Sequence, residues 1–114
     1  MTTLYGIKNC DTVRKARRWL DDNGVEYSFH DVRSDGLDSK TLQTWEQQLG
    51  WERLLNRRGT TWRRLPDKVR DGVDRTRALQ IMLDNPAIIK RPVLAVSRQL
   101  YLGFSAVTYG EIFN

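Results

Sequence analysis

The sequence predicts an α/β protein with a four-stranded mixed sheet, and three observations support this fold class. Thr2–Ile7 and Val25–Val32 have the apolar or alternating pattern of strands, and they flank a helical pattern over Asp11–Asn23. A mainly helical stretch follows at about residues 38–84. Two short apolar runs and a final helical pattern close the chain. The predicted order is therefore β-α-β, a helical insertion, and β-β-α.

The first unit is a strand, a helix and a second strand. Asp11 or Thr12 is expected to cap the helix, because short polar side chains accept hydrogen bonds from unpaired backbone N–H groups. The Asn23-Gly24 pair is a typical helix stop. Short connections on both sides of the helix predict a parallel strand pair with a right-handed crossover.

The middle of the chain is predicted to be helical. Asp38 opens a helix that Gly50 ends, and a short second helix is expected from Trp51 to about Asn56. An arginine-rich loop follows, with two apolar residues as packing anchors, Trp62 and Leu65. The last helix of the insertion spans Arg75–Asp84 and ends at Asn85-Pro86, with four residues facing inward: Ala78, Leu79, Met82 and Leu83.

The C-terminal part returns to strands. Pro92–Val96 and Gln99–Gly103 read as two strands joined by a tight antiparallel hairpin at Ser97-Arg98. Ser105 is expected to cap a terminal helix that carries Val107, Ile112 and Phe113. The complete order is that of a thioredoxin-type fold with a helical insertion, and we expect residues 1–114 to form a single domain.

Composition excludes several classes of protein. One cysteine in 114 residues permits no internal disulfide, so a disulfide-stapled secreted scaffold is excluded. The N-terminal residues do not resemble a signal peptide, and no apolar run reaches the roughly 20 residues of a membrane helix. We therefore expect a cytoplasmic protein without membrane partners.

The net charge is +5, and seven arginines fall between Arg57 and Arg77. Nucleic-acid binding is not favoured, because acidic residues are interleaved with these arginines. No spacing of His and Cys residues suggests a metal site.

Cys10 lies where the first strand gives way to the first helix. A thiol at this junction lies close to unpaired N–H groups and to the positive end of the helix dipole. Both favour the thiolate, which is the nucleophilic form. The flanking cations Lys8 and Arg14 act in the same direction. The alternative is a small buried hydrophobic residue, but the polar neighbours of Cys10 favour a reactive role.

Three segments together resemble the arsenate reductase/Spx (ArsC-like) family, in particular its small YffB-type members: Tyr5–Thr12, Leu55–Thr60 and Asn85–Val93. The resemblance covers nearly the whole chain. It implies a thioredoxin-like core with a helical insertion and a cysteine at the N-terminus of the first helix. It also implies a cis proline facing that cysteine, here Pro92, although the residues alone favour an ordinary trans bond.

The resemblance implies a site built around Cys10. Arg58 and Arg91 are candidates for binding carboxylates or oxyanions and for stabilising the thiolate, with Arg57 as the competitor of Arg58. Other residues expected to contact substrate or glutathione are Asn9, Asp11, Thr12 and Pro92. The expected function is a glutathione-dependent thiol–disulfide reductase with one nucleophilic cysteine. It would use glutathione as co-substrate, hold no bound cofactor or metal, and act on a small-molecule or protein disulfide.

Two departures from the family bear on the alternative functions. Arsenate reductases of this family carry an arginine after the final hairpin, where this chain has Leu102–Ser105 without a cation. Their insertion arginine aligns most naturally with Asn56. Regulators of the Spx type, which bind RNA polymerase, often carry Cys-x-x-Cys, and Val13 occupies the fourth position here. Both alternatives therefore rank below the reductase.

Overall fold

The computed structural model describes all residues, 1–114, and the chain divides into two compact units. The first unit comprises Met1–Asp35 and Arg91–Asn114, and the second comprises Gly36–Lys90. The second unit corresponds to the predicted helical insertion and extends it by a few residues at each end. That the whole chain forms one domain stays a prediction.

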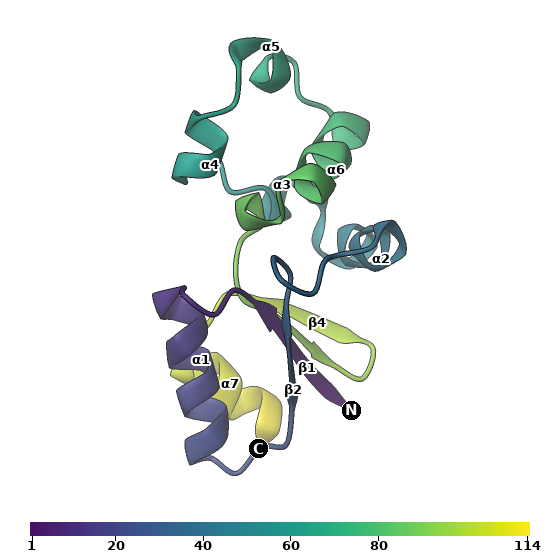
Figure 1. The fold of residues 1–114 in the computed structure, drawn as a ribbon. Helices are drawn as coiled ribbons and strands as arrows, with labels where there is room; N and C mark the ends of the chain where they lie inside the picture. Colours follow the sequence, from purple (N-terminus) through teal and green to yellow (C-terminus); the bar gives the residue numbers. More distant parts are fainter. The chain divides into compact units, whose positions relative to one another are not determined.

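A four-stranded mixed sheet forms the centre of the first unit, which confirms the predicted fold class (Figure 1). Its strands lie in the order β2-β1-β3-β4. β1 is parallel to β2 and antiparallel to β3, and β3 and β4 form the antiparallel hairpin. The strands are β1 (Thr2–Gly6), β2 (Ser28–Asp31), β3 (Val93–Val96) and β4 (Gln99–Leu102).

Both helices of this unit, α1 (Asp11–Asp22) and α7 (Ala106–Phe113), cover the same face of the sheet (Figure 1). Leu4 and Leu94 are directly opposite each other on β1 and β3, so their side chains leave the sheet on one side. With residues of both helices they form a solvent-excluded core: Leu4, Val13, Ala16, Leu20, Leu94 and Tyr109.

The terminal helix packs differently from the sequence prediction. Ser105 is its N-cap as expected, with Oγ accepting a hydrogen bond from the Thr108 N–H at 3.1 Å. Val107, however, is 73% exposed, and Tyr109 is the fully buried residue. Rings of three neighbours surround the Tyr109 side chain: Trp19, Phe104 and Phe113. The periodicity of one short helix did not reveal which of its faces meets the sheet.

The second strand is shorter than predicted, because the residues after α1 complete the end of the helix. Gly24 has a positive φ of 66°, and the N–H of Val25 bonds to the C=O of Leu20 at 3.0 Å. Val25 therefore belongs to the helix stop, and the ladder with β1 begins at Ser28. β1 likewise ends at Gly6, one residue earlier than expected.

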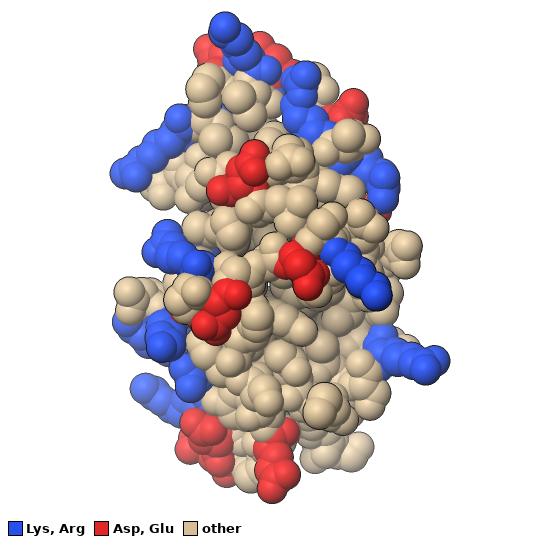
Figure 2. All heavy atoms as spheres, turned by 45° about the vertical axis from the view of Figure 1, so that its right-hand side comes forward, with Lys and Arg blue, Asp and Glu red and all other residues tan.

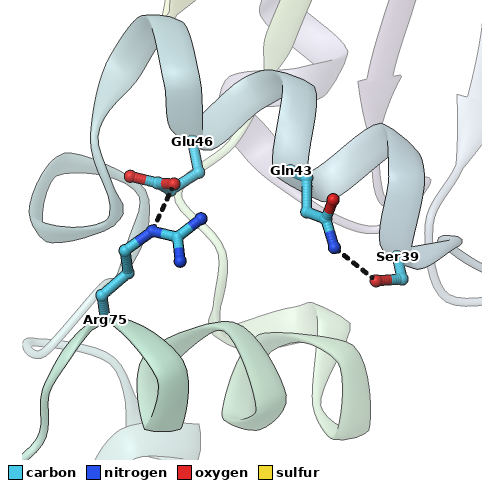
Figure 3. Close-up of polar contacts among 4 residues, drawn as sticks. All are labelled: Ser39, Gln43, Glu46 and Arg75. Atoms are coloured by element: carbon cyan, nitrogen blue, oxygen red, sulfur yellow. Dashed lines mark hydrogen bonds and ion pairs between the residues drawn. The ribbon is translucent and has the colours of Figure 1, made fainter.

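The second unit is helical, as predicted. Its elements are α2 (Ser39–Leu49), α3 (Trp51–Leu54), α4 (Thr60–Arg63), α5 (Asp67–Arg70), α6 (Arg75–Asp84) and the 3-10 turn η1 (Pro86–Ile88). Asp38 caps α2 by accepting the Thr41 N–H at 2.7 Å, and Gly50 ends this helix with a φ of 83°. The Nε of Arg75 donates to Glu46 Oε1 at 2.7 Å, which joins α6 to α2, and Gln43 donates to Ser39 within α2 (Figure 3).

Two predictions for this unit need correction. The arginine-rich segment is not a continuous loop, because it contains the single-turn helices α4 and α5. One helical turn is too short to produce a recognisable apolar period. In α6, Ala78 and Met82 are buried as predicted, but Ile81 is also buried, whereas Leu79 and Leu83 are only half-buried.

Candidate active site around Cys10

Cys10 is the N-cap residue of α1. A turn follows β1, in which the Cys10 N–H bonds to the C=O of Ile7 at 3.2 Å. The Cys10 backbone is extended (φ −93°, ψ 126°), and its C=O accepts the first helical bond from the Arg14 N–H at 3.0 Å. The prediction that Asp11 or Thr12 caps the helix is therefore wrong. The side chain of Asp11 instead pairs with Arg14, at 3.1 Å, within the first helical turn.

The surroundings of Cys10 lower the pKa of its thiol. Partial burial acts to raise this pKa, but the backbone N–H of Val13, the Arg91 guanidinium and the N–H of Thr12 together outweigh burial. Arg91 contributes both a hydrogen bond to the sulfur and its positive charge. These donors stabilise the thiolate in preference to the neutral thiol, because N–H groups and a positive charge interact more strongly with a charged sulfur. The direction is that expected of a nucleophilic cysteine.

A close approach between β1 and α1 sets the position of this helix N-terminus. A Cβ atom on Gly6 would lie 2.7 and 2.9 Å from the two methyl carbons of Val13. Only glycine therefore lets the first turn of α1, with its Thr12 and Val13 amides, sit this close to the strand that leads to Cys10. Gly6 was missed as a site residue in the sequence, where it fits no phosphate-binding fingerprint.

Asp31, at the end of β2, is the second residue that the sequence did not reveal. It is only 5% exposed, and its carboxylate accepts three backbone hydrogen bonds. Oδ2 accepts from the Lys8 N–H at 3.1 Å, and Oδ1 accepts from Arg33 at 2.8 Å and Ser34 at 3.1 Å. Burial acts to raise the pKa of Asp31, but these N–H groups and the charge of Lys8 lower it overall. Asp31 is therefore an ionised group that holds the segment leading to Cys10.

Arg91 and Pro92 precede β3. The Arg91–Pro92 peptide bond is cis, which confirms what the family resemblance implied. Pro92 is fully buried, and its C=O accepts the Gly103 N–H at 2.9 Å. Arg91 is half-buried beside Cys10. The first unit thus brings together three of the predicted site residues, Cys10, Thr12 and Arg91. That Pro92 faces the cysteine stays a prediction.

Asn9 and Asp11, predicted to contact substrate, flank Cys10 and are both exposed. Asn9 lies in the turn before the cysteine, and Asp11 is the first residue of α1. Their backbone positions at the helix N-terminus are as expected. Whether they contact a substrate stays a prediction.

Arg58 lies in the second unit. It is exposed, and its N–H donates to Asn56 Oδ1 at 3.1 Å. With Arg57 and Lys90 it lines a cationic pocket of about 440 Å³ that also contains Glu52, Leu55 and Asn56. The guanidinium carbon of Arg57 lies 5.7 Å from the ring centroids of both Trp51 and Trp62, within cation–π range. Arg57 therefore has a packing role that Arg58 does not share, and the role of Arg58 at Cys10 stays a prediction.

The charged surface is of mixed sign. Figure 2 shows acidic side chains interspersed among the basic ones on the face in view. Within the arginine-rich segment, Arg70 pairs with Asp67 and Arg75 pairs with Glu46. These pairs neutralise part of the basic cluster. No helix has the length and apolar character required to cross a bilayer.

Comparison with known proteins places the chain among relatives of the same size. The ArsC family model matches residues 5–112. An uncharacterized protein of Haemophilus influenzae is 46% identical over 99% of both chains. The solved structure of a protein named YffB has a TM-score of 0.93 at 42% identity and covers 97% of both chains. An arsenate reductase (ArsC) related protein from Brucella melitensis has a TM-score of 0.79 at 49% identity, over 98% of this chain and 93% of that one.

A more distant relative is the global transcriptional regulator Spx of Staphylococcus aureus, which is 26% identical over 92% of this chain and 81% of its own length. The family match spans both units, including the strand–helix junction at Cys10 and the Arg91–Pro92 segment. This chain belongs to the ArsC family.

Proposed function

We propose that this protein is a glutathione-dependent thiol–disulfide reductase in which Cys10 is the nucleophile. The observation that supports the proposal best is the donor set around the sulfur: two backbone N–H groups of the first helical turn and the Arg91 guanidinium. These groups increase the thiolate fraction near neutral pH, and the thiolate is the attacking species in disulfide exchange. No second cysteine is present in the chain, so the resolving thiol must come from another molecule.

The proposed cycle has two exchange steps. The Cys10 thiolate attacks the glutathione sulfur of a mixed disulfide, which forms a Cys10–glutathione disulfide and releases the substrate thiolate to take up a proton. A second glutathione thiolate attacks the glutathione sulfur of that adduct, which releases the Cys10 thiolate and glutathione disulfide. The net result is that one free glutathione thiol reduces the mixed disulfide, which gives the substrate thiol and one molecule of glutathione disulfide.

Glutathione offers carboxylates to the cations of this protein. Arg91 is the proposed partner in the first unit, because it already lies beside the sulfur that forms the adduct. Arg58 is the proposed partner in the second unit, since its guanidinium is not stacked on tryptophan as that of Arg57 is. Asn9, Asp11, Thr12 and Pro92 are proposed to contact the peptide. Such a cycle suits the cytoplasm, where glutathione keeps thiols reduced.

The test combines adduct formation with turnover. Incubation with glutathione disulfide is expected to add one glutathionyl group to the intact protein, and reduced glutathione is expected to remove it, as measured by mass spectrometry. The Cys10→Ser variant is expected to give neither the adduct nor reduction of a glutathione mixed disulfide. An Arg18→Gln variant, altered on the exposed side of α1, serves as a folded control with full activity. Activity retained by Cys10→Ser would refute the mechanism.

Arsenate reduction is a second candidate, favoured by the 49% identity to a protein described as related to arsenate reductase. The segment after the hairpin argues against it. Arsenate reductases of the family carry an arginine in this segment, whereas this chain has no cation there. The segment contains Phe104, whose ring packs on Tyr109 with centroids 4.7 Å apart. Release of arsenite by the purified protein with glutathione and glutaredoxin would favour this candidate over the reductase.

A regulator that binds RNA polymerase is a third candidate, favoured by the similarity to Spx. At the fourth position of the Cys-x-x-Cys pattern this chain has Val13, which is fully buried in the core of the first unit. The position is therefore filled by packing and offers no second thiol. Specific co-purification with polymerase subunits, together with an unreactive Cys10, would favour the regulator.

A further inference from the structure

We propose that Asp31 is a positioning residue for Cys10: its carboxylate fixes the turn between β1 and α1 and thereby aims the first-turn amides at the sulfur. The inference rests on the proposed role of Cys10 as a thiolate nucleophile. Asp31 itself does not enter the exchange chemistry.

The hydrogen bonds of Asp31 connect two segments that follow neighbouring parallel strands. Oδ2 accepts the Lys8 N–H at 3.1 Å, two residues before Cys10 and across 23 residues of sequence. Oδ1 accepts the N–H groups of Arg33 and Ser34 from its own loop. One buried carboxylate therefore ties the turn before α1 to the loop after β2.

The backbone at Asp31 is also fixed by hydrogen bonds. The Asp31 N–H donates to Asp35 Oδ2 at 3.1 Å, and the adjacent Val32 N–H donates to the C=O of Gly6 at 2.9 Å. The last pair of the β1–β2 ladder is Gly6 with Asp31, so Asp31 lies beside the end of β1. Because both strands are anchored here, the Lys8 N–H has a fixed acceptor.

One short turn connects Lys8, which Asp31 holds, to Cys10. Lys8 and Asn9 are exposed, and the turn is closed by the Cys10 N–H to Ile7 C=O bond of 3.2 Å. The Lys8 N–H donates to the Asp31 side chain, so loss of this acceptor releases the turn at Lys8. A displaced turn would move the sulfur away from the Thr12 and Val13 amides, on which the stabilisation of the thiolate depends.

The substitution Asp31→Asn separates positioning from simple charge. The amide keeps the size of the carboxylate but has an acceptor oxygen on one side only. Whichever side keeps its partner, the bridge between Lys8 and the Arg33–Ser34 pair is broken, and the turn before α1 is no longer fixed to the loop after β2. Removal of a negative charge near a thiolate would lower the pKa of Cys10. Loss of positioning would raise this pKa, because the first-turn amides no longer meet the sulfur. The two roles thus predict shifts of opposite sign.

The measurement is the pH dependence of Cys10 alkylation by iodoacetamide on the 114-residue chain, with the thermal unfolding temperature recorded in parallel. We expect the pH midpoint of alkylation to rise by about one unit in Asp31→Asn, because the thiolate loses about one hydrogen bond to its charged sulfur. The matched control is Asp35→Asn, which removes a carboxylate charge from the same loop. Its amide oxygen can still accept the Asp31 N–H, and Asp35 makes no bond to Lys8. Asp35→Asn is expected to leave the alkylation midpoint within a few tenths of a unit of the wild-type value.

A lowered or unchanged midpoint in folded Asp31→Asn, or an equal rise in Asp35→Asn, would overturn the proposal. If Asp31→Asn does not fold, hydrogen exchange of the wild-type protein decides instead: the exposed Lys8 must show an amide protected by its bond to Asp31, and unprotected exchange would overturn the proposal. Alkylation needs no glutathione. Failure of glutathione turnover therefore leaves this test intact and is distinguishable from failure of the positioning role.

Discussion

Replacement of Arg91 by glutamine tests the electrostatic basis of the proposed chemistry. Arg91 acts on Cys10 in two ways, by a hydrogen bond to the sulfur and by its positive charge, and glutamine removes the charge and the guanidinium fork. A hydrogen bond to a charged group contributes about 1.5–3 kcal/mol. Cys10 is only partly buried, so solvent screening places the effect at the lower end of that range. One pKa unit corresponds to about 1.4 kcal/mol, so the pKa of Cys10 is expected to rise by about one unit.

The assay is the rate of iodoacetamide alkylation as a function of pH, which follows the thiolate fraction. Below both midpoints, a rise of one unit lowers the thiolate fraction about tenfold, and the alkylation rate falls in proportion. Arg91→Lys keeps the charge but not the planar fork and is expected to fall between the wild type and Arg91→Gln. The control is Arg18→Gln, an equal change in net charge at an exposed position of α1. If Arg91→Gln titrates like the wild type, or if Arg18→Gln shifts equally, the local role assigned to Arg91 is refuted.

Three further predictions concern stability, each measured by denaturant unfolding. Gly6→Ala places a methyl group 2.7 Å from a Val13 methyl carbon and is expected to cost about 1–3 kcal/mol; adding Val13→Ala should relieve part of this overlap, and strictly additive losses would contradict the close-packing argument. Tyr109→Phe removes a buried hydroxyl that has no hydrogen-bond partner, so the free energy of unfolding should stay equal or rise by up to about 1 kcal/mol, and a loss above that size would show that the hydroxyl is satisfied. Because the pKa of Cys10 is lowered on folding, the unfolded chain binds more protons between the folded and unfolded pKa values, and wild-type stability should rise relative to Cys10→Ser as pH increases toward about 8.5. A stability difference that does not change with pH would contradict the lowered pKa.

The sequence was informative where the signal is local. Ser105 caps its helix as predicted, and Asp38 caps the helix that it was predicted to open, because each cap depends on a side chain and an N–H group three residues later. The strand-to-helix junction at Cys10 follows from a change of apolar period within a dozen residues. The cis bond before Pro92 is different, since the residues alone favoured trans and only the family resemblance implied cis.

The sequence was less informative where an element is short or its end depends on neighbours. α4 and α5 are single turns without a period of their own, and they were predicted as loop. Valine is a residue type common in strands, but Val25 completes the end of α1. The choice between Arg57 and Arg58 stayed open in the sequence, and it is the contact of Arg57 with two tryptophan rings that distinguishes them.

By itself the sequence determined the α/β class, the order of the elements and the place of the lone thiol at the start of the first long helix, because periodicity and capping act between residues close together in the chain. Only the tertiary structure decided which polar and small groups meet that helix start: the Asp31 carboxylate on the Lys8 amide, the bare Cα of Gly6 against Val13, and the guanidinium of Arg91 at the sulfur. These contacts join residues that are distant in the sequence or depend on how closely two elements pack. A one-dimensional pattern records neither.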